Sequence, residues 1–176
     1  MVPVLTARLQ HETQTYFDQL RQQHFPPERN FVRAHLTLFH ALPQVNRNAM
    51  MLRLHDITRR ESPMEGWSFK LQLLGRGVAF VVDCPRLASL RASLAQLWHC
   101  ELTAQDRQTP RLHITVQNKA TPEAARALLD ALNRDFKPRH LLFEGLDLWR
   151  YLGGGPWSLF VHEETDGRHS ADDFPL

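Results

Sequence analysis

Two short apolar runs each contain a histidine and a threonine two residues apart. The first is HLTL from His35, and the second is HITV from His113. In a β-strand alternate side chains share a face, so each histidine lies beside its threonine while the apolar residues point to the other face. Near neutral pH an imidazole gives up or takes up a proton, and a hydroxyl donates a hydrogen bond. Each pair therefore suits either chemistry on a ligand or a buried hydrogen-bonding partner.

The two motifs occupy equivalent places in an internal repeat. When the chain is shifted against itself by 78 positions, the separation of the two histidines, Arg33 falls on Arg111 and Thr37 on Thr115 without a gap. The same shift superposes the apolar residues of two predicted helices: Met50, Met51 and Leu54 on Leu128, Leu129 and Leu132. This repeat predicts a duplication in which the two motif strands meet about an approximate two-fold axis and form a cleft with paired histidines.

A third histidine-threonine pair, His11 and Thr13, lacks these features. Its central residue is the charged Glu12, and it lies at a predicted helix start with no counterpart in the other half. We interpret it as a solvated or capping segment. The apolar neighbours of the other two motifs, and the arginine two residues before each histidine, distinguish them from chance matches.

The paired motifs HLTL and HITV resemble those of the 2H phosphoesterase superfamily, and the chain is most similar to bacterial RNA 2′,3′-cyclic phosphodiesterases, also called 2′-5′ RNA ligases. The resemblance extends from the first strand to about Phe160. It implies a bilobed, duplicated α+β fold, with two antiparallel-sheet lobes and outer helices around a central cleft. It also implies RNA ends or cyclic nucleotides as substrates, and reversible 2′-5′ RNA ligase activity as an additional expectation.

Two histidines suffice to open a cyclic phosphodiester with water. One takes a proton from the nucleophile and the other protonates the departing ribose oxygen, and neither step needs a metal. Thr37 and Thr115 can donate hydrogen bonds to the phosphate oxygens on which negative charge grows. The resemblance implies His113 as the base and His35 as the acid, although the near-symmetry of the motifs makes this assignment reversible.

Five further residues are candidate substrate contacts, each with a structural alternative. Arg33, Arg111 and Lys119 could attract a phosphate or could simply be solvated. Phe39 and Tyr151 could stack on a nucleobase, although large aromatic side chains more often pack in a core. Family members often carry an arginine or lysine five residues after the second motif histidine; here Asn118 holds that place and Lys119 follows, a departure that bears on substrate choice.

Hydrophobic periodicity predicts alternating strands and helices that could position the motifs. Besides the motif strand within 31–43, strands are predicted at 2–9, 67–74, 77–84, 111–118, 140–152 and 156–163. Helices are predicted at 11–25, 46–61, 85–99 and 121–136, the last with Thr121 as N-cap. We expect one duplicated domain over 1–164, with lobes of about 1–76 and 77–164 between which strands could be exchanged, and a polar tail at 165–176.

Net charge, cysteine content and hydropathy exclude several classes of protein. A formal charge of +2 over 176 residues argues against binding nucleic acid through a broad cationic surface. Cys84 and Cys100 form no CxxC pair, which favours free thiols and a reducing compartment. No run is apolar enough to span a bilayer, and the amino terminus does not resemble a signal peptide. We expect a cytoplasmic monomer with no metal and no cofactor.

The leading hypothesis is a metal-independent phosphoesterase that acts on 2′,3′-cyclic phosphate ends of RNA or nucleotides. One alternative is a non-catalytic module of the same fold that binds a phosphate or an RNA end. A second alternative is a metal hydrolase with histidine ligands. It is disfavoured because no carboxylate lies at a recognisable companion spacing.

Overall fold

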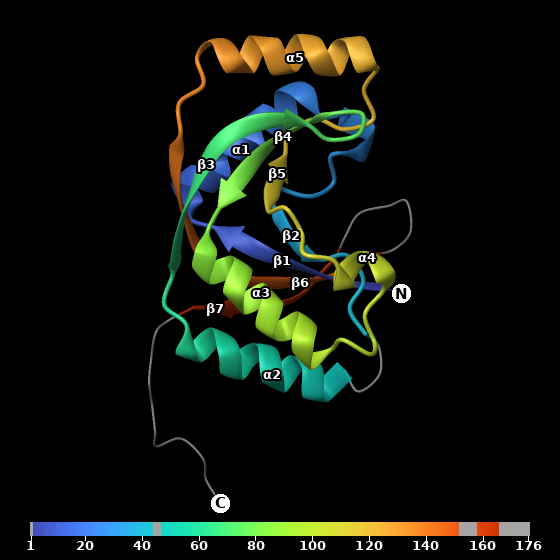
Figure 1. Ribbon diagram of the computed structural model, residues 1–176, viewed down its shortest axis with the longest axis vertical. Helices are drawn as coiled ribbons and strands as arrows, with labels where there is room; N and C mark the ends of the chain where they lie inside the picture. Colours follow the sequence, from blue (N-terminus) through green and yellow to red (C-terminus); the bar gives the residue numbers. More distant parts are fainter. Residues whose placement is uncertain (1, 44–46, 152–157, 166–176) are drawn as a thin grey trace, which may run out of the picture.

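The computed structural model describes residues 2–43, 47–151 and 158–165, and it is an α+β protein (Figure 1). The strands are β1 (Val2–Leu9), β2 (Leu36–Phe39), β3 (Met64–Leu73), β4 (Val78–Asp83), β5 (His113–Thr115), β6 (Arg139–Tyr151) and β7 (Ser158–Glu164). The helices are α1 (His11–His24), α2 (Arg47–Arg60), α3 (Pro85–Leu97), α4 (Ala104–Arg107) and α5 (Pro122–Arg134), with a 3₁₀ turn at Pro27–Arg29. The predicted fold class is confirmed, whereas the predicted polar tail lies outside the described residues except for Thr165.

The described strands form one antiparallel sheet in the order β1-β2-β5-β4-β3-β6-β7. An additional pairing joins β1 to β6, because β6 pairs with β3 through its first residues and with β1 through the remainder. The strands β1, β2, β5, β4, β3 and β6 therefore form a closed circuit of pairings. The two motif strands, β2 and β5, are neighbours in this circuit.

The helices cover strands that are distant in the sequence. Figure 1 shows α5 at one end of the molecule and α2 and α3 at the other. Phe17 of α1 packs edge-on against Phe80 of β4, with ring centres 5.1 Å apart. Trp98, directly after α3, packs in the same way against Phe39 of β2 at 5.6 Å. The helix that follows β1 thus packs on β4, and the helix that follows β4 packs on β2.

Local sequence signals explain how α5 begins. The Thr121 side chain accepts a hydrogen bond from the Ala124 N–H at 3.2 Å, and Pro122 occupies the first turn, where its missing N–H costs no hydrogen bond. The predicted N-cap is confirmed. None of the helices in the described ranges is long and apolar enough to cross a membrane.

A β-bulge in β2 changes the side-chain alternation just after the first motif. Thr37 pairs with Thr6 but Phe39 pairs with the adjacent Leu5, so Leu38 is an extra residue on this strand. As a result Leu38 and Phe39 are both buried, although they are neighbours. Phe39, a candidate for stacking on a nucleobase, therefore packs in the core, which is the structural alternative considered for it above.

Candidate active site

The two motif strands lie side by side, with Leu36 of β2 opposite Ile114 of β5. Both of these apolar side chains are fully buried in the core. Because neighbouring residues in a strand face opposite ways, the histidine and threonine of each motif lie on the other face of the sheet. His35, Thr37, His113 and Thr115 are all half-buried there. The structure therefore brings the four predicted motif residues together, although β2 begins only at Leu36 and both strands are shorter than predicted.

Each of the two imidazoles is held by an equivalent hydrogen bond to a backbone carbonyl two residues earlier. His35 Nδ1 lies 2.8 Å from the carbonyl oxygen of Arg33, and His113 Nδ1 lies 2.7 Å from that of Arg111. A carbonyl oxygen only accepts, so Nδ1 carries the hydrogen in each ring. Nε2 is then the nitrogen of each ring that is available to take up or give a proton.

The environment of His35 favours its neutral form. Burial lowers the pKa of His35 to about 4, the hydrogen bond to the Arg33 carbonyl opposes this shift, and positive charge on Arg21, His113 and His40 adds to it. At pH 7 His35 is therefore an uncharged imidazole in the free protein.

Helix α1 fixes the chain just before the first motif. The Ala34 N–H donates to Asp18 Oδ1 at 2.6 Å, and Gln14 Nε2 donates to the Ala34 carbonyl oxygen at 2.7 Å. Arg33 Nε also donates to Asp18, at 2.7 Å, while most of its side chain stays exposed. Arg33, predicted to contact substrate, thus has an ion pair that helps to orient the segment preceding His35.

A buried arginine from α1, which sequence reasoning missed, holds the second motif. Arg21 is 5% exposed, and its Nη1 donates to the Thr115 carbonyl oxygen at 3.0 Å while its Nε donates to Asn30 at 3.1 Å. The guanidinium carbon lies 3.9 Å from the centre of the Phe25 ring. Burial lowers the pKa of Arg21 to about 10, although the Asp18 charge raises it, so the group stays charged at neutral pH.

A second buried arginine, from α3, holds the first motif in a corresponding way. Arg91 Nε donates to the Leu38 carbonyl oxygen at 3.3 Å, and Nη2 donates to the backbone oxygen of Asp106. Its guanidinium carbon lies 4.4 Å from the centre of the Phe39 ring. Each motif strand is thus bound by an arginine from a helix that precedes the other motif strand.

Asp106 of α4 anchors the end of β2. Asp106 is 1% exposed, and its carboxylate accepts hydrogen bonds from the backbone N–H groups of His40 at 3.0 Å and Ala41 at 2.8 Å. Burial alone would raise the pKa of Asp106, but hydrogen bonds from the His40 side chain and from these two N–H groups hold it below its usual value. The buried carboxylate is therefore ionised and holds the chain just after the first motif.

The remaining predicted contacts fall in different places. Arg111 Nη1 donates to Gln72 Oε1 at 3.0 Å, and Arg111 lines a cavity next to the second motif. Lys119 is exposed, and its backbone adopts a positive φ of 58°. Tyr151 ends β6, but its side chain lies outside the described part of the structure.

The described residues contain no group of three or more histidine, cysteine or acidic side chains placed to hold a metal ion. His40 contacts Asp106, with Nδ1 and Oδ1 3.3 Å apart. Its role in the structure is to support the end of β2.

Comparison with known proteins agrees with this fold. A family model described as the 2′-5′ RNA ligase superfamily matches residues 9–155. The crystal structure of TT0787 of Thermus thermophilus superposes with a TM-score of 0.59 at 17% sequence identity, covering 96% of this chain and all of that one. The sequence comparison with curated proteins found no match. Because the family model spans most of the chain, the protein belongs to the 2′-5′ RNA ligase superfamily.

Proposed function

We propose that the protein is a metal-independent phosphoesterase that hydrolyses 2′,3′-cyclic phosphate ends of RNA or nucleotides. Membership of the superfamily supports a function of phosphoesterase or ligase type. The observation that carries the finer proposal is the pair of histidines on one face of adjacent strands, each with Nδ1 bound to a backbone carbonyl. That arrangement leaves two Nε2 atoms to exchange protons with one phosphate and its nucleophile.

The proposed reaction needs one proton taken and one proton given. A neutral imidazole removes a proton from water as its oxygen forms a bond to phosphorus. The bond from phosphorus to one ribose oxygen breaks, and the charged imidazole protonates that oxygen, which leaves a ribose phosphomonoester. The hydroxyls of Thr37 and Thr115 donate to the non-bridging oxygens as their negative charge increases.

The pH dependence of the reaction tests the two histidine roles. The pKa of about 4 keeps His35 neutral at pH 7 in the free protein, which is the form a base needs, and so supports His35 as base and His113 as acid, the reverse of what the resemblance implies. We expect a bell-shaped profile of kcat/KM in which the acidic limb lies below about 6.5, because activity falls only when His35 becomes protonated. This limb should disappear in His35→Asn. If the acidic limb disappears in His113→Asn instead, His113 is the base and His35 is the acid.

A substrate screen tests the reaction itself. Purified protein with a chelator present should convert 2′,3′-cyclic nucleotides or RNA ending in a cyclic phosphate to phosphomonoesters, and NMR of the product phosphorus would locate the phosphate on the 2′ or the 3′ oxygen. Loss of turnover with chelator and its return with a divalent metal would indicate a metal hydrolase. Binding of these compounds without turnover would indicate the non-catalytic module.

A further inference from the structure

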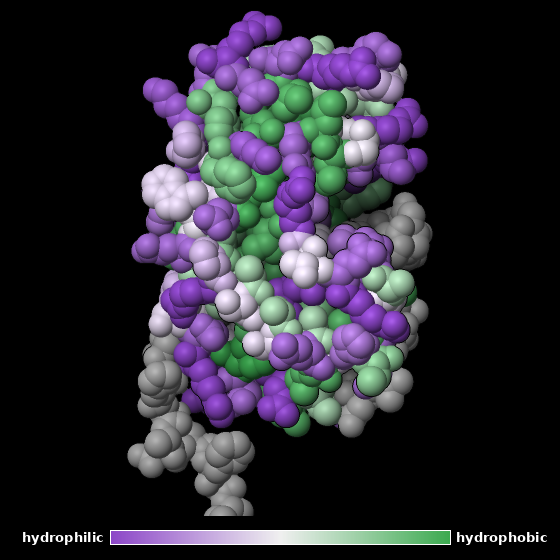
Figure 2. Space-filling model, in the orientation of Figure 1, coloured by the Kyte–Doolittle hydropathy of each residue, from purple (hydrophilic) through white to green (hydrophobic). Residues whose placement is uncertain are grey.

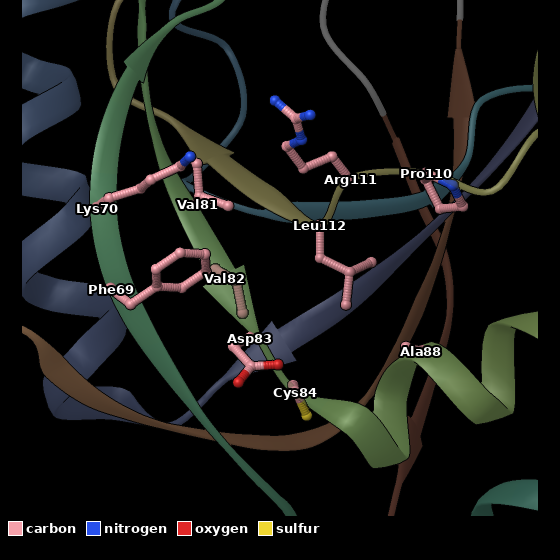
Figure 3. A pocket seen from close by; sticks show the side chains of 10 residues that line it. All are labelled: Phe69, Lys70, Val81, Val82, Asp83, Cys84, Ala88, Pro110, Arg111 and Leu112. Atoms are coloured by element: carbon pink, nitrogen blue, oxygen red, sulfur yellow. The ribbon is translucent and has the colours of Figure 1, made fainter.

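A cavity of about 390 Å³ lies next to the second motif, in the concave face formed by β3, β4 and the segment leading to β5 (Figure 3). Figure 2 shows apolar side chains in the hollow of this face, with hydrophilic side chains around it. The cavity is lined by Phe69, Lys70, Val81 and Arg111, among others. Its volume is within the range of small-molecule sites.

A β-bulge in β3 places two neighbouring side chains in this cavity. Ser68 pairs with Val82 but Lys70 pairs with Val81, so Phe69 is an extra residue on β3. Before the bulge the odd-numbered side chains of β3 are exposed, whereas at the bulge Phe69 and Lys70 are both exposed and Leu71 is buried. Bulges often re-aim side chains beside active sites, and this one brings an aromatic ring and a cation to the same place.

The cavity lies close to the candidate active site, because one of its lining residues, Val81, pairs with His113. Lys70 pairs with Val81 across β3 and β4, and Val81 pairs with His113 across β4 and β5. Paired residues in a ladder share a face, so the Lys70 and His113 side chains project from the same face, with their backbones two strand spacings, or about 10 Å, apart. Lys70, Val81 and His113 thus form a row across three strands. A phosphate held at His113 lies at one end of this row, and the cavity lies at the other end.

The chemistry of the lining fits one part of an RNA chain. Phe69 is 44% exposed, and Lys70 Nζ lies 5.9 Å from the centre of its ring. An exposed aromatic ring is suited to stacking on a base. Lys70 and Arg111 are two cations beyond the reacting phosphate, and they match a second phosphate, which an RNA chain has and a cyclic mononucleotide lacks. The Asp83 carboxylate in the lining can accept a hydrogen bond from a base or a ribose hydroxyl.

We propose that this cavity binds the penultimate nucleotide of an RNA substrate, with its base stacked on Phe69 and the phosphodiester that joins it to the terminal nucleotide beside Lys70 and Arg111. The proposal rests on the function proposed above. Binding in this cavity makes the protein selective for RNA ends over free cyclic mononucleotides, because only an RNA end reaches both the histidines and the cavity.

The test compares two substrates in three variants. Phe69→Ala should raise KM for a dinucleotide ending in a 2′,3′-cyclic phosphate by about 5–150-fold, the range expected for the loss of one stacked base, with kcat unchanged. Lys70→Ala should also raise the KM for the dinucleotide. Because one phosphate contact is lost, this KM should rise less steeply with salt concentration in Lys70→Ala than in the wild type. Both variants should leave a cyclic mononucleotide unaffected. Trp67→Ala is the matched control, because Trp67 is an exposed aromatic residue on the same strand that does not line the cavity.

Binding separates this proposal from the catalytic one. A fluorescent dinucleotide ending in a 2′-phosphate should bind more weakly to Phe69→Ala and Lys70→Ala than to the wild type and Trp67→Ala, whether or not the protein turns over any substrate. Equal binding by all four proteins, an unchanged dinucleotide KM, or an equal rise in KM for the dinucleotide and the mononucleotide would overturn the proposal. Absence of turnover together with weakened binding in the two variants would overturn the catalytic function alone.

Discussion

Replacing His113 with asparagine is expected to lower kcat on a cyclic-phosphate substrate by about 10²–10⁴-fold, the usual contribution of a positioned acid or base. The asparagine amide can still donate to the Arg111 carbonyl, which His113 Nδ1 contacts at 2.7 Å, but it has no group in the place of Nε2. His35→Asn should have an effect of the same size, because its Nδ1 makes the equivalent bond to Arg33. Steady-state kinetics with chelator present would measure both losses.

The control for this prediction is His99→Ala, which removes an exposed histidine outside both motifs. It should keep full activity. Circular dichroism and thermal melting should show that the two asparagine variants fold as the wild type does. If both variants fold normally and retain full turnover, acid-base catalysis by this histidine pair is excluded.

Replacing Asp106 with alanine is expected to lower the free energy of unfolding by about 2–4 kcal/mol, because it removes a buried carboxylate and leaves the part-buried N–H groups of His40 and Ala41 without their acceptor. For a chain of this size the melting temperature should fall by roughly 4–16 °C. Activity should fall as well, since Asp106 fixes the end of the strand that carries Thr37. Urea or thermal unfolding at neutral pH would measure the loss of stability.

Acid provides an independent check on Asp106. Its pKa is held below the usual value, so its contribution is fully present above the unfolded-state pKa and is lost as the pH falls through the folded-state pKa. The stability difference between the wild type and Asp106→Ala should therefore shrink at acid pH. Asp56→Ala is the matched control: Asp56 forms an exposed pair with Arg60, whose loss should cost about 1 kcal/mol or less. Equal stability of both variants would contradict the role of Asp106.

The motif residues could be predicted because their information is local and repeated. A spacing of two residues puts His35 beside Thr37 in any strand, and the repeat indicated that the second motif would have an equivalent place. The structure brings the two motifs together through the pairing of Leu36 with Ile114. Bulges were not predictable in this way. The extra residues at Leu38 and Phe69 interrupt strands whose alternation otherwise continues, and they decide that Phe39 is buried and that Lys70 is exposed.

The buried arginines were missed because their partners are distant backbone carbonyls. Arg21 binds an oxygen 94 residues away and Arg91 one 53 residues away, and no local pattern encodes a bond to a carbonyl. The helical spacing of the two arginines was a weak sequence signal of their burial. Arg21 lies four residues after Phe17, and Arg91 four after Leu87, so both arginines occupy the buried faces of their helices.

The crossed arginines also limit how the protein can move and unfold. Arg21 lies between β1 and β2 in the chain but holds β5, whereas Arg91 lies between β4 and β5 but holds β2. A hinge that separated β2 from β5 would have to pull charged, buried guanidinium groups away from their acceptors, which is costly inside a protein. The two motif strands should therefore move as one rigid unit, and melting of either half should remove support from the other, so that the halves unfold together in one cooperative transition.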